Sequence, residues 1–255
     1  MIDIHSHILP GIDDGAKDIE TSLKMLKLAE ASGTEIIVAT PHYIKNRYEN
    51  TYEATEVIYN KLKLEAKAAG INIEILLGQE VMLEKHSLEL CKEKKLRGIN
   101  CSRYMLVEFP MDKLPADALD LIYELRLQNI TPILAHPERY MYVLEDITQI
   151  NDFAEEGCLF QINTGSLQGI FGKKVQSAAT ELISHGMVNF IASDAHSINK
   201  RCPGLSEGFR EAENIETGIT EKIHYNLKAI IENQELNIEF EKLKKKKKFF
   251  DFLKK

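Results

Sequence analysis

Short apolar runs alternate with longer amphipathic segments along most of this chain. Residues 2–6 alternate isoleucine with polar residues, which is the two-residue period of a β-strand. Further apolar runs predict six more strands, at 35–40, 73–78, 104–107, 131–135, 159–162 and 188–192. Helical periodicity between the runs predicts helices at about 18–32, 51–69, 84–97, 115–128, 147–156 and 172–185. A helical region after Ile219 is expected to pack outside them.

This sevenfold alternation of strand and helix indicates an α/β fold with parallel strands. Alternation alone does not separate a closed barrel from an open doubly wound sheet. The strands are followed by side chains that bind metals or protons: His5 and His7, His42, Glu80, Glu108, His136, Asn163, and Asp194 with His196. Edge strands of an open sheet lie too far apart to share a site, whereas the carboxyl ends of barrel strands converge. The sequence therefore predicts a seven-stranded (β/α) barrel, one strand short of the usual eight, as a single domain over residues 1–241.

The composition is that of an ordinary globular protein, with 44% apolar and 28% charged residues among 255. The N-terminus has no basic and apolar segments of the kind found in secretory signals. No apolar run approaches the roughly 18 residues that would span a bilayer. The four cysteines form no CxxC pair, which favours reduced thiols. We therefore expect a cytoplasmic protein.

The formal net charge of −7 conceals an asymmetry between the body of the chain and its end. Residues 242–255 contain eight lysines and one aspartate, so the remaining 241 residues carry 24 basic and 38 acidic side chains. An acidic body does not suit a nucleic-acid-binding protein. The lysine-rich tail, with Phe249 and Phe250, could contact an anionic membrane surface, and a solvated tail is the alternative.

The chemistry-bearing residues form a nitrogen and oxygen ligand set without thiolates. It comprises His5, His7, Asp14, His42, Glu80, Glu108, His136, Asp194 and His196. Such a set suits Mn²⁺, Fe²⁺ or Zn²⁺ better than a structural zinc or Ca²⁺. Because one ion takes about four to six ligands, these candidates favour two or three clustered ions that share a bridging carboxylate.

Five short motifs, in order, resemble those of the PHP (polymerase and histidinol phosphatase) family. They are His5-Ser6-His7, Thr40-Pro41-His42, Gly78-Gln79-Glu80, Ala135-His136-Pro137-Glu138-Arg139 and Ser193-Asp194-Ala195-His196. The stretch from His7 to Ala16, with Asp13-Asp14-Gly15, is similar to PHP tyrosine phosphatases of bacterial capsule and exopolysaccharide systems. The resemblance covers about residues 1–205.

The resemblance implies a distorted barrel of the PHP type with a trinuclear site, usually loaded with manganese, at the carboxyl ends of the strands. By motif, one ion would be held by His5, His7, Glu80 and Asp194. A second would be held by Glu80, Glu108 and His136, and a third by Asp14, His42 and His196. Two phosphate-binding arginines of the family match Arg139 and Arg201.

The implied activity is hydrolysis of phosphotyrosine on a bacterial tyrosine kinase, by attack of a metal-bound hydroxide on phosphorus. A histidinol-phosphate phosphatase, or another small-molecule phosphomonoesterase on the same scaffold, is the alternative. A non-enzymatic binding module on the same barrel is disfavoured, because every metal-ligand position of the family motifs holds a ligand-type residue.

The segment from Cys91 to Arg97 has the C-x₅-R spacing of thiol-dependent tyrosine phosphatases. That chemistry needs a glycine-rich phosphate loop and a thiolate of low pKa. The residues between Cys91 and Arg97 are charged helix formers, which indicates a coincidental match.

Overall fold

The computed structural model describes residues 1–236, 238 and 240–244. Its strands are β1 (Ile2–Ser6), β2 (Ile36–Ala39), β3 (His42–Ile44), β4 (Tyr48–Glu49), β5 (Glu74–Leu77), β6 (Glu80–Met82), β7 (Tyr104–Glu108), β8 (Thr131–Ala135), β9 (Leu159–Asn163) and β10 (Phe190–Ala192). All seven predicted strands are present, and the short strands β3, β4 and β6 were not predicted; β3 and β6 follow closely after the second and third predicted strands. The predicted tail lies outside the described residues from position 245 onward.

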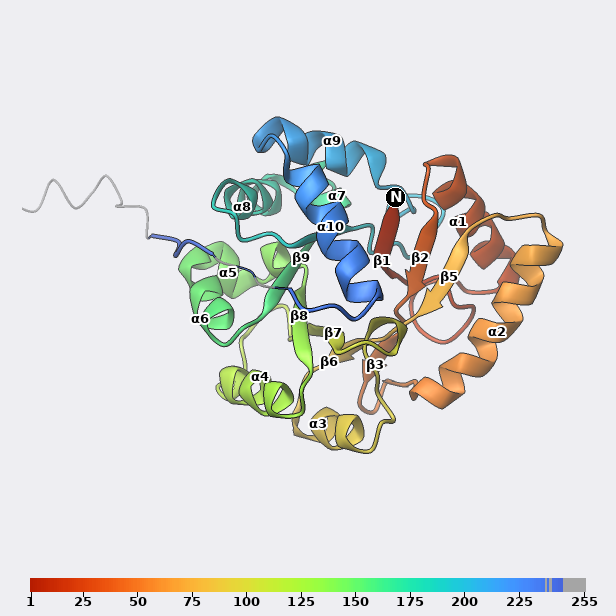
Figure 1. The fold of residues 1–255 in the computed structure, drawn as a ribbon, viewed down its shortest axis with the longest axis horizontal. Helices are drawn as coiled ribbons and strands as arrows, with labels where there is room; N and C mark the ends of the chain where they lie inside the picture. Colours follow the sequence, from red (N-terminus) through yellow and green to blue (C-terminus); the bar gives the residue numbers. More distant parts are fainter. Residues whose placement is uncertain (237, 239, 245–255) are drawn as a thin grey trace, which may run out of the picture.

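Helices surround the strands on most sides (Figure 1). They are α1 (Ile19–Ala31), α2 (Tyr52–Ala68), α3 (Lys85–Lys92), α4 (Ala118–Leu127), α5 (Met141–Glu145), α6 (Ile150–Glu155), α7 (Thr164–Leu167), α8 (Lys173–Ser184), α9 (Ser206–Ile215) and α10 (Ile219–Ile231). Short 3₁₀ turns occur at η1 (Ile99–Cys101), η2 (Pro137–Arg139) and η3 (Ile147–Gln149). None of the described helices is long and apolar enough to cross a membrane.

The fold is mixed α/β with parallel strands, but the predicted closed barrel is not confirmed. The strands form two sheets, β1-β2-β5 and β10-β9-β8-β7-β6-β3-β4. All pairings are parallel except the short β3–β4 hairpin. The division falls where β2 runs into β3 through Pro41 and where β5 runs into β6 through Gly78. Proline has no N–H to donate to a sheet, so the ladder is interrupted there.

The end of β1 is nevertheless joined to the segment that follows β10. Ser6 and Ala195 form an isolated parallel bridge, and His7 N donates to Ala195 O at 2.8 Å. Asp194 N donates to His5 O at 2.9 Å. These contacts bring the residues after the first and last strands beside each other.

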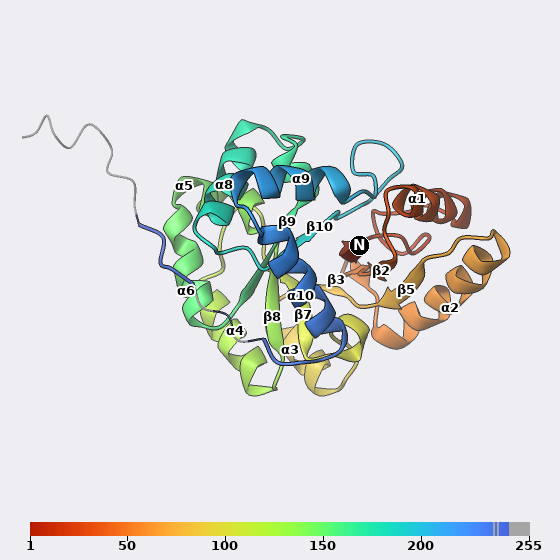
Figure 2. The ribbon, with the colours of Figure 1, turned by 45° about the horizontal axis from the view of Figure 1, so that its top comes forward.

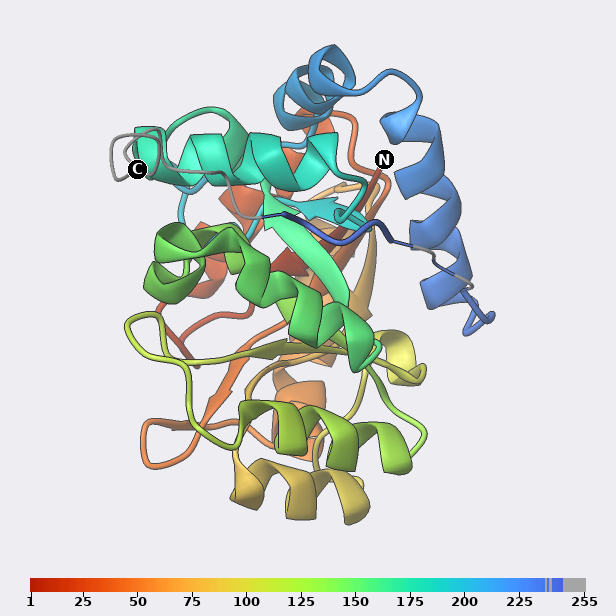
Figure 3. The same cartoon turned by 90° about the vertical axis from the view of Figure 1, so that its left-hand side faces the viewer.

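The amino ends of the strands are covered by the C-terminal part of the chain. Helix α10 packs beside β1 and β10, and Figures 2 and 3 show it on the outside of the strands. After α10 the chain reaches the start of β7, where Tyr104 Oη donates to Gln234 O at 2.7 Å. The opposite, carboxyl ends of the strands carry the predicted ligand residues, and the loops that follow the strands lie there.

Candidate metal centre

A tight loop after β1 brings two aspartates back to the histidines at the strand's end. Ala16 N donates to His7 O at 2.9 Å, and this close return is possible because residue 15 is glycine. A Cβ at Gly15 would lie 2.2 Å from His7 O. The loop places Asp13 Oδ2 2.8 Å from His7 Nδ1, and Asp14 Oδ1 3.4 Å from His42 Nε2.

Glu80 occupies the middle of the cluster, where four imidazoles surround its carboxylate. Glu80 Oε2 lies 3.2 Å from His5 Nε2, 3.2 Å from His7 Nε2 and 3.0 Å from His42 Nδ1. Glu80 Oε1 lies 3.0 Å from His136 Nε2. The carboxylate is fully buried. A carboxylate in this position could bridge two or more ions.

The remaining predicted ligands complete two sides of the cluster. Glu108 Oε1 lies 3.0 Å from His42 Nδ1. Asp194 Oδ1 lies 3.4 Å from both His5 Nε2 and His196 Nδ1. On the outer side, His196 Nε2 lies 3.5 Å from Asp14 Oδ1, and the Asp14 side chain is 45% exposed. The structure thus brings all nine predicted residues into one cluster that opens toward Asp14.

Three groups of donor atoms within this cluster are close enough to hold an ion each. They are His7, Asp14, His42 and His196; His5, His7 and Glu80; and His42, Glu80 and Glu108. These groups differ from the sets implied by motif resemblance, because His42 joins Glu80 and Glu108 where His136 was expected. His7 and His42 each belong to two groups, whereas the motifs assign each histidine to a single ion.

Several buried atoms at the cluster accept or donate no hydrogen bond of proper geometry. They include Glu80 Oε2, Glu108 Oε1 and Asp194 Oδ1, together with Nδ1 of His42 and of His136. Buried polar atoms normally have a partner, and an unpaired buried carboxylate oxygen is especially unfavourable. Because His42 Nδ1 lies 3.0 Å from both Glu80 Oε2 and Glu108 Oε1, divalent cations fit this donor set.

The charges in the cluster also suit metal binding. Burial raises the pKa of Glu80, but the neighbouring His5 and His42 outweigh it and hold that pKa well below its usual range. Burial lowers the pKa of His136 to about 4, with a contribution from Arg139. Burial and His7 lower the pKa of His196 to about 4. At neutral pH Glu80 is therefore a carboxylate and His136 and His196 are neutral, the forms that bind metals. Burial lowers the pKa of His5 and of His42, but the facing carboxylates outweigh it and raise these pKa values to about 9 and about 12. A bound cation would take the place of the protons on these two rings.

Asp13 and Gln161, which are not among the predicted ligands, orient His7 and His5 through hydrogen bonds to Nδ1 of each ring. Asp13 accepts from His7 Nδ1, and its side chain also accepts from Gly15 N and His42 N. Gln161 Oε1 accepts from His5 Nδ1 at 2.7 Å. In both cases the bond leaves Nε2 of the histidine with its lone pair toward the cluster. Polar residues at 161 and 163 in the otherwise apolar strand β9 are the sequence signal for Gln161.

Two ligands occupy the left-handed backbone region, where glycine is normally favoured. His136 has φ of 37° and Asp194 has φ of 51°. This conformation costs a non-glycine residue free energy, and it recurs at functional sites. At both positions the chain turns directly after a strand, which directs the side chain into the cluster.

Arg139 and Arg201 converge on the outer oxygen of Asp194. Arg139 Nη1 lies 2.9 Å and Arg201 Nη2 lies 2.6 Å from Asp194 Oδ2. Asn163 Nδ2 donates to the same oxygen at 2.6 Å. Asp194 thus turns one oxygen toward the histidines and the other toward two guanidinium groups. An anion at the mouth of the cluster would meet both arginines.

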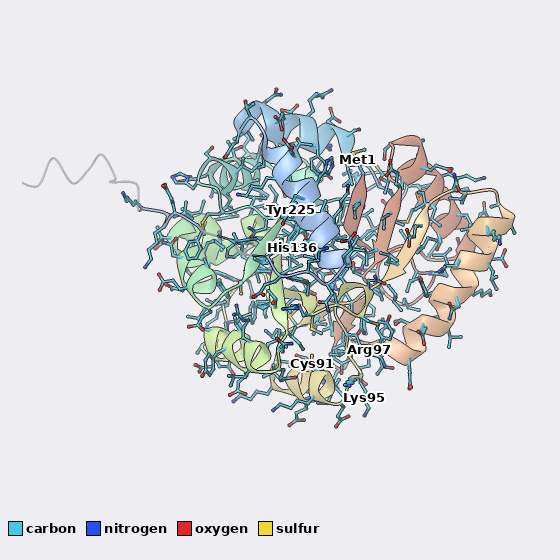
Figure 4. The ribbon with its side chains drawn as sticks, viewed as in Figure 1. Met1, Cys91, Lys95, Arg97, His136 and Tyr225 are labelled. Atoms are coloured by element: carbon cyan, nitrogen blue, oxygen red, sulfur yellow. The ribbon has the colours of Figure 1, made fainter. Side chains whose placement is uncertain are left out.

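The Cys91–Arg97 segment lies apart from this site. Cys91, on α3, is buried, and burial raises the pKa of its thiol to about 12. Arg97 instead stacks on Tyr52, with Cζ 4.7 Å from the ring centroid. Figure 4 shows Cys91 and Arg97 beside α3, away from His136. A thiol with this pKa and no phosphate-binding loop is not a nucleophile at neutral pH.

The sequence matches the family described as capsular polysaccharide synthesis, CpsB/CapC, over residues 1–234. CapC of Staphylococcus aureus is 37% identical over 211 residues, 83% of each chain. The tyrosine-protein phosphatase YwqE of Bacillus subtilis is 36% identical over 201 residues, 79% of each chain.

A solved structure agrees with these sequence matches. The crystal structures of YwqE from Bacillus subtilis and CpsB from Streptococcus pneumoniae, described as metal-dependent tyrosine phosphatases, include a chain that superposes with a TM-score of 0.90. It is 33% identical, and the match covers 97% of this chain and all of the other. The chain therefore belongs to the CpsB/CapC family of capsular polysaccharide synthesis.

Proposed function

We propose that this chain is a metal-dependent protein-tyrosine phosphatase that hydrolyses phosphotyrosine on a bacterial tyrosine kinase of capsule or exopolysaccharide synthesis. The observation that carries the proposal is the pairing of a buried cluster of nine ligand-type residues with two arginines at its mouth. The name of YwqE gives the same reaction class, and the family's description gives capsular polysaccharide synthesis.

The donor set supports two to three divalent ions, for which we propose Mn²⁺, with Fe²⁺ or Zn²⁺ as alternatives. His7, Asp14, His42 and His196 would hold one, and Glu80 would be shared by the others with His5, His7, His42 and Glu108. When bound, such ions neutralise phosphoryl charge and supply a water of lowered pKa to attack phosphorus.

The arginines would bind the phosphoryl group on its outer side. A guanidinium contacts two phosphoryl oxygens at once, and these contacts strengthen as charge spreads over the oxygens during transfer. In the present structure Asp194 holds both guanidinium groups within about 3 Å of one oxygen. Asp194 therefore positions the arginines before substrate arrives. A phenolate, whose pKa is about 10, leaves with less protonation than an alkoxide.

Histidinol-phosphate phosphatase is not favoured, because the matched relative YwqE is named for tyrosine phosphatase activity. A substrate panel tests the proposal. We expect the Mn²⁺-loaded protein to release phosphate from a phosphotyrosine peptide with a higher kcat/KM than from histidinol phosphate or phosphoserine. A preference for histidinol phosphate would replace the proposed function by its alternative.

Thiol chemistry gives a separate prediction for Cys91. The variant Cys91→Ser is expected to keep near-normal turnover of an aryl phosphate, since the thiol is buried and protonated. Alkylation of the exposed Cys101 in a Cys202→Ser variant should be equally harmless, whereas a strong chelator should abolish turnover. Steady-state assays measure this, and loss of turnover in Cys91→Ser would contradict it.

Asp13→Asn should weaken divalent-ion affinity by about 10- to 100-fold, because Asp13 orients His7 without facing the ions. Calorimetric titration with Mn²⁺ measures the change directly. Asp18→Asn is the matched control, since Asp18 caps α1 in the same loop region and contacts Thr21 instead. Equal affinities in the two variants would remove the positioning role of Asp13.

Other expectations remain proposals. We infer that the two sheets act as one distorted barrel, supported by the contact of Ser6 with Ala195. A single domain over residues 1–241, a cytoplasmic location, the absence of nucleic-acid binding and a membrane contact of the lysine-rich tail stay predictions. The described residues include only the first three positions of that tail, 242–244.

A further inference from the structure

A cavity of about 180 Å³ opens beside the two arginines, between the segment after β9 and the segment after β10. Arg201 itself lines the cavity, and Ser193, next to Asp194, forms part of its inner end. Arg139 reaches the same place from the other side, because its Cζ lies 4.5 Å from the ring centroid of Phe171, another lining residue. The cavity is therefore continuous with the place where a phosphoryl group would bind.

The walls of the cavity combine apolar side chains with a positive rim. Ile170 and Phe171 form one wall, and Ile170 is 45% exposed. Lys200 and Arg201 also line the cavity. The one acidic lining residue, Glu207, is already paired with Arg210 at 2.9 Å. A cavity lined by both apolar side chains and cations suits an aromatic ring, whose edges pack on hydrocarbon and whose face attracts positive charge.

The volume agrees with this occupant. A protein cavity of roughly 150 Å³ can hold a benzene molecule. We infer that the cavity formed by Ile170 and Phe171 with Lys200 and Arg201 binds the phenyl ring of phosphotyrosine, an assignment that rests on the proposed function. Ile170 and Phe171 would then determine specificity for aryl over alkyl phosphates. An alkyl phosphate would bind the same arginines but leave the apolar wall uncovered.

The test compares two non-hydrolysable probes, phenylphosphonate and methylphosphonate, by calorimetry on the full-length Mn²⁺-loaded protein. We expect the unmodified protein to bind phenylphosphonate about tenfold more tightly. Ile170→Ser should lose about three- to fivefold in affinity for phenylphosphonate and none for methylphosphonate. Ile170→Leu should restore the difference.

Ile198→Ser is the matched control, because Ile198 is 40% exposed on the neighbouring loop but does not line the cavity. Equal affinity of the unmodified protein for the two phosphonates would overturn the assignment, as would equal effects of the two serine variants.

Turnover of a phosphotyrosine peptide is measured on the same preparations. Turnover without a preference for phenylphosphonate would refute the ring site and leave the proposed function standing. A preference for phenylphosphonate without turnover would support the ring site and refute the proposed function.

Discussion

Alanine at Arg139 or Arg201 is expected to lower kcat on a phosphotyrosine peptide by about 10²- to 10³-fold while the protein keeps its bound metal. Loss of one contact that strengthens in the transition state usually has this effect. Both guanidinium groups meet at Asp194 Oδ2, on the side of Asp194 away from the histidines. Their loss therefore removes phosphoryl contacts and leaves the donor atoms of the cluster in place.

The substitution Arg139→Lys should recover little activity, because an ammonium group does not make the planar two-point contact. Arg97→Ala is the control for loss of an arginine outside the site, since Arg97 stacks on Tyr52. Assays of kcat and elemental analysis are made on the same samples. Near-normal turnover in both alanine variants would show that the phosphoryl group is held elsewhere.

The second large effect concerns Glu80, where metal and activity should be lost together. Glu80→Gln keeps the shape of the side chain but removes the charge that faces His5, His7 and His42. We expect the variant to lose the ions that Glu80 shares, to retain at most about one ion, at His7, Asp14, His42 and His196, and to keep under about one thousandth of the activity, since bound ions supply several kcal/mol of transition-state stabilisation.

Glu138→Gln provides a buried control for this experiment. Glu138 is as buried as Glu80, but its Oε1 accepts from Asn163 N and Ser166 Oγ rather than facing the histidines. That variant should keep its metal. Full metal content and turnover in Glu80→Gln would contradict the role of Glu80 as a shared ligand.

The strands could be predicted because their burial produces apolar runs that stand out from the helices. Strand β7 is buried at all five positions, and its residues before Glu108 read as one such run. The ligands could be predicted for a related reason, since polar residues directly after buried strands need a partner at a shared face of the fold.

The features that were missed depend on contacts between distant segments. Helix α9 begins at Ser206 without a side-chain cap and has a glycine at position 208, both weak helix signals. Gly208 is explained only by packing, because a Cβ there would lie 2.5 Å from Thr164 Cγ2. The β3–β4 hairpin is too short to give a clear period, and it turns at Asn46 with φ of 61°.

The division of the strands into two sheets and the sharing of ligands could not be predicted from the sequence. Pro41 is visible in the sequence, but its effect on the ladder depends on which strand lies beside it. The motifs place His42 at the end of a strand without saying which neighbour it faces. Its Nδ1 lies 3.0 Å from both Glu80 and Glu108, a geometry that only the folded chain provides.

Phosphate release per added ion tests the central claim most directly. Protein stripped with a chelator is titrated with Mn²⁺ while turnover of a phosphotyrosine peptide and bound metal are measured together. We predict no turnover without metal, and activity that rises and saturates at about two to three ions per chain. Turnover of the stripped protein equal to that of the loaded protein would contradict the metal-dependent mechanism.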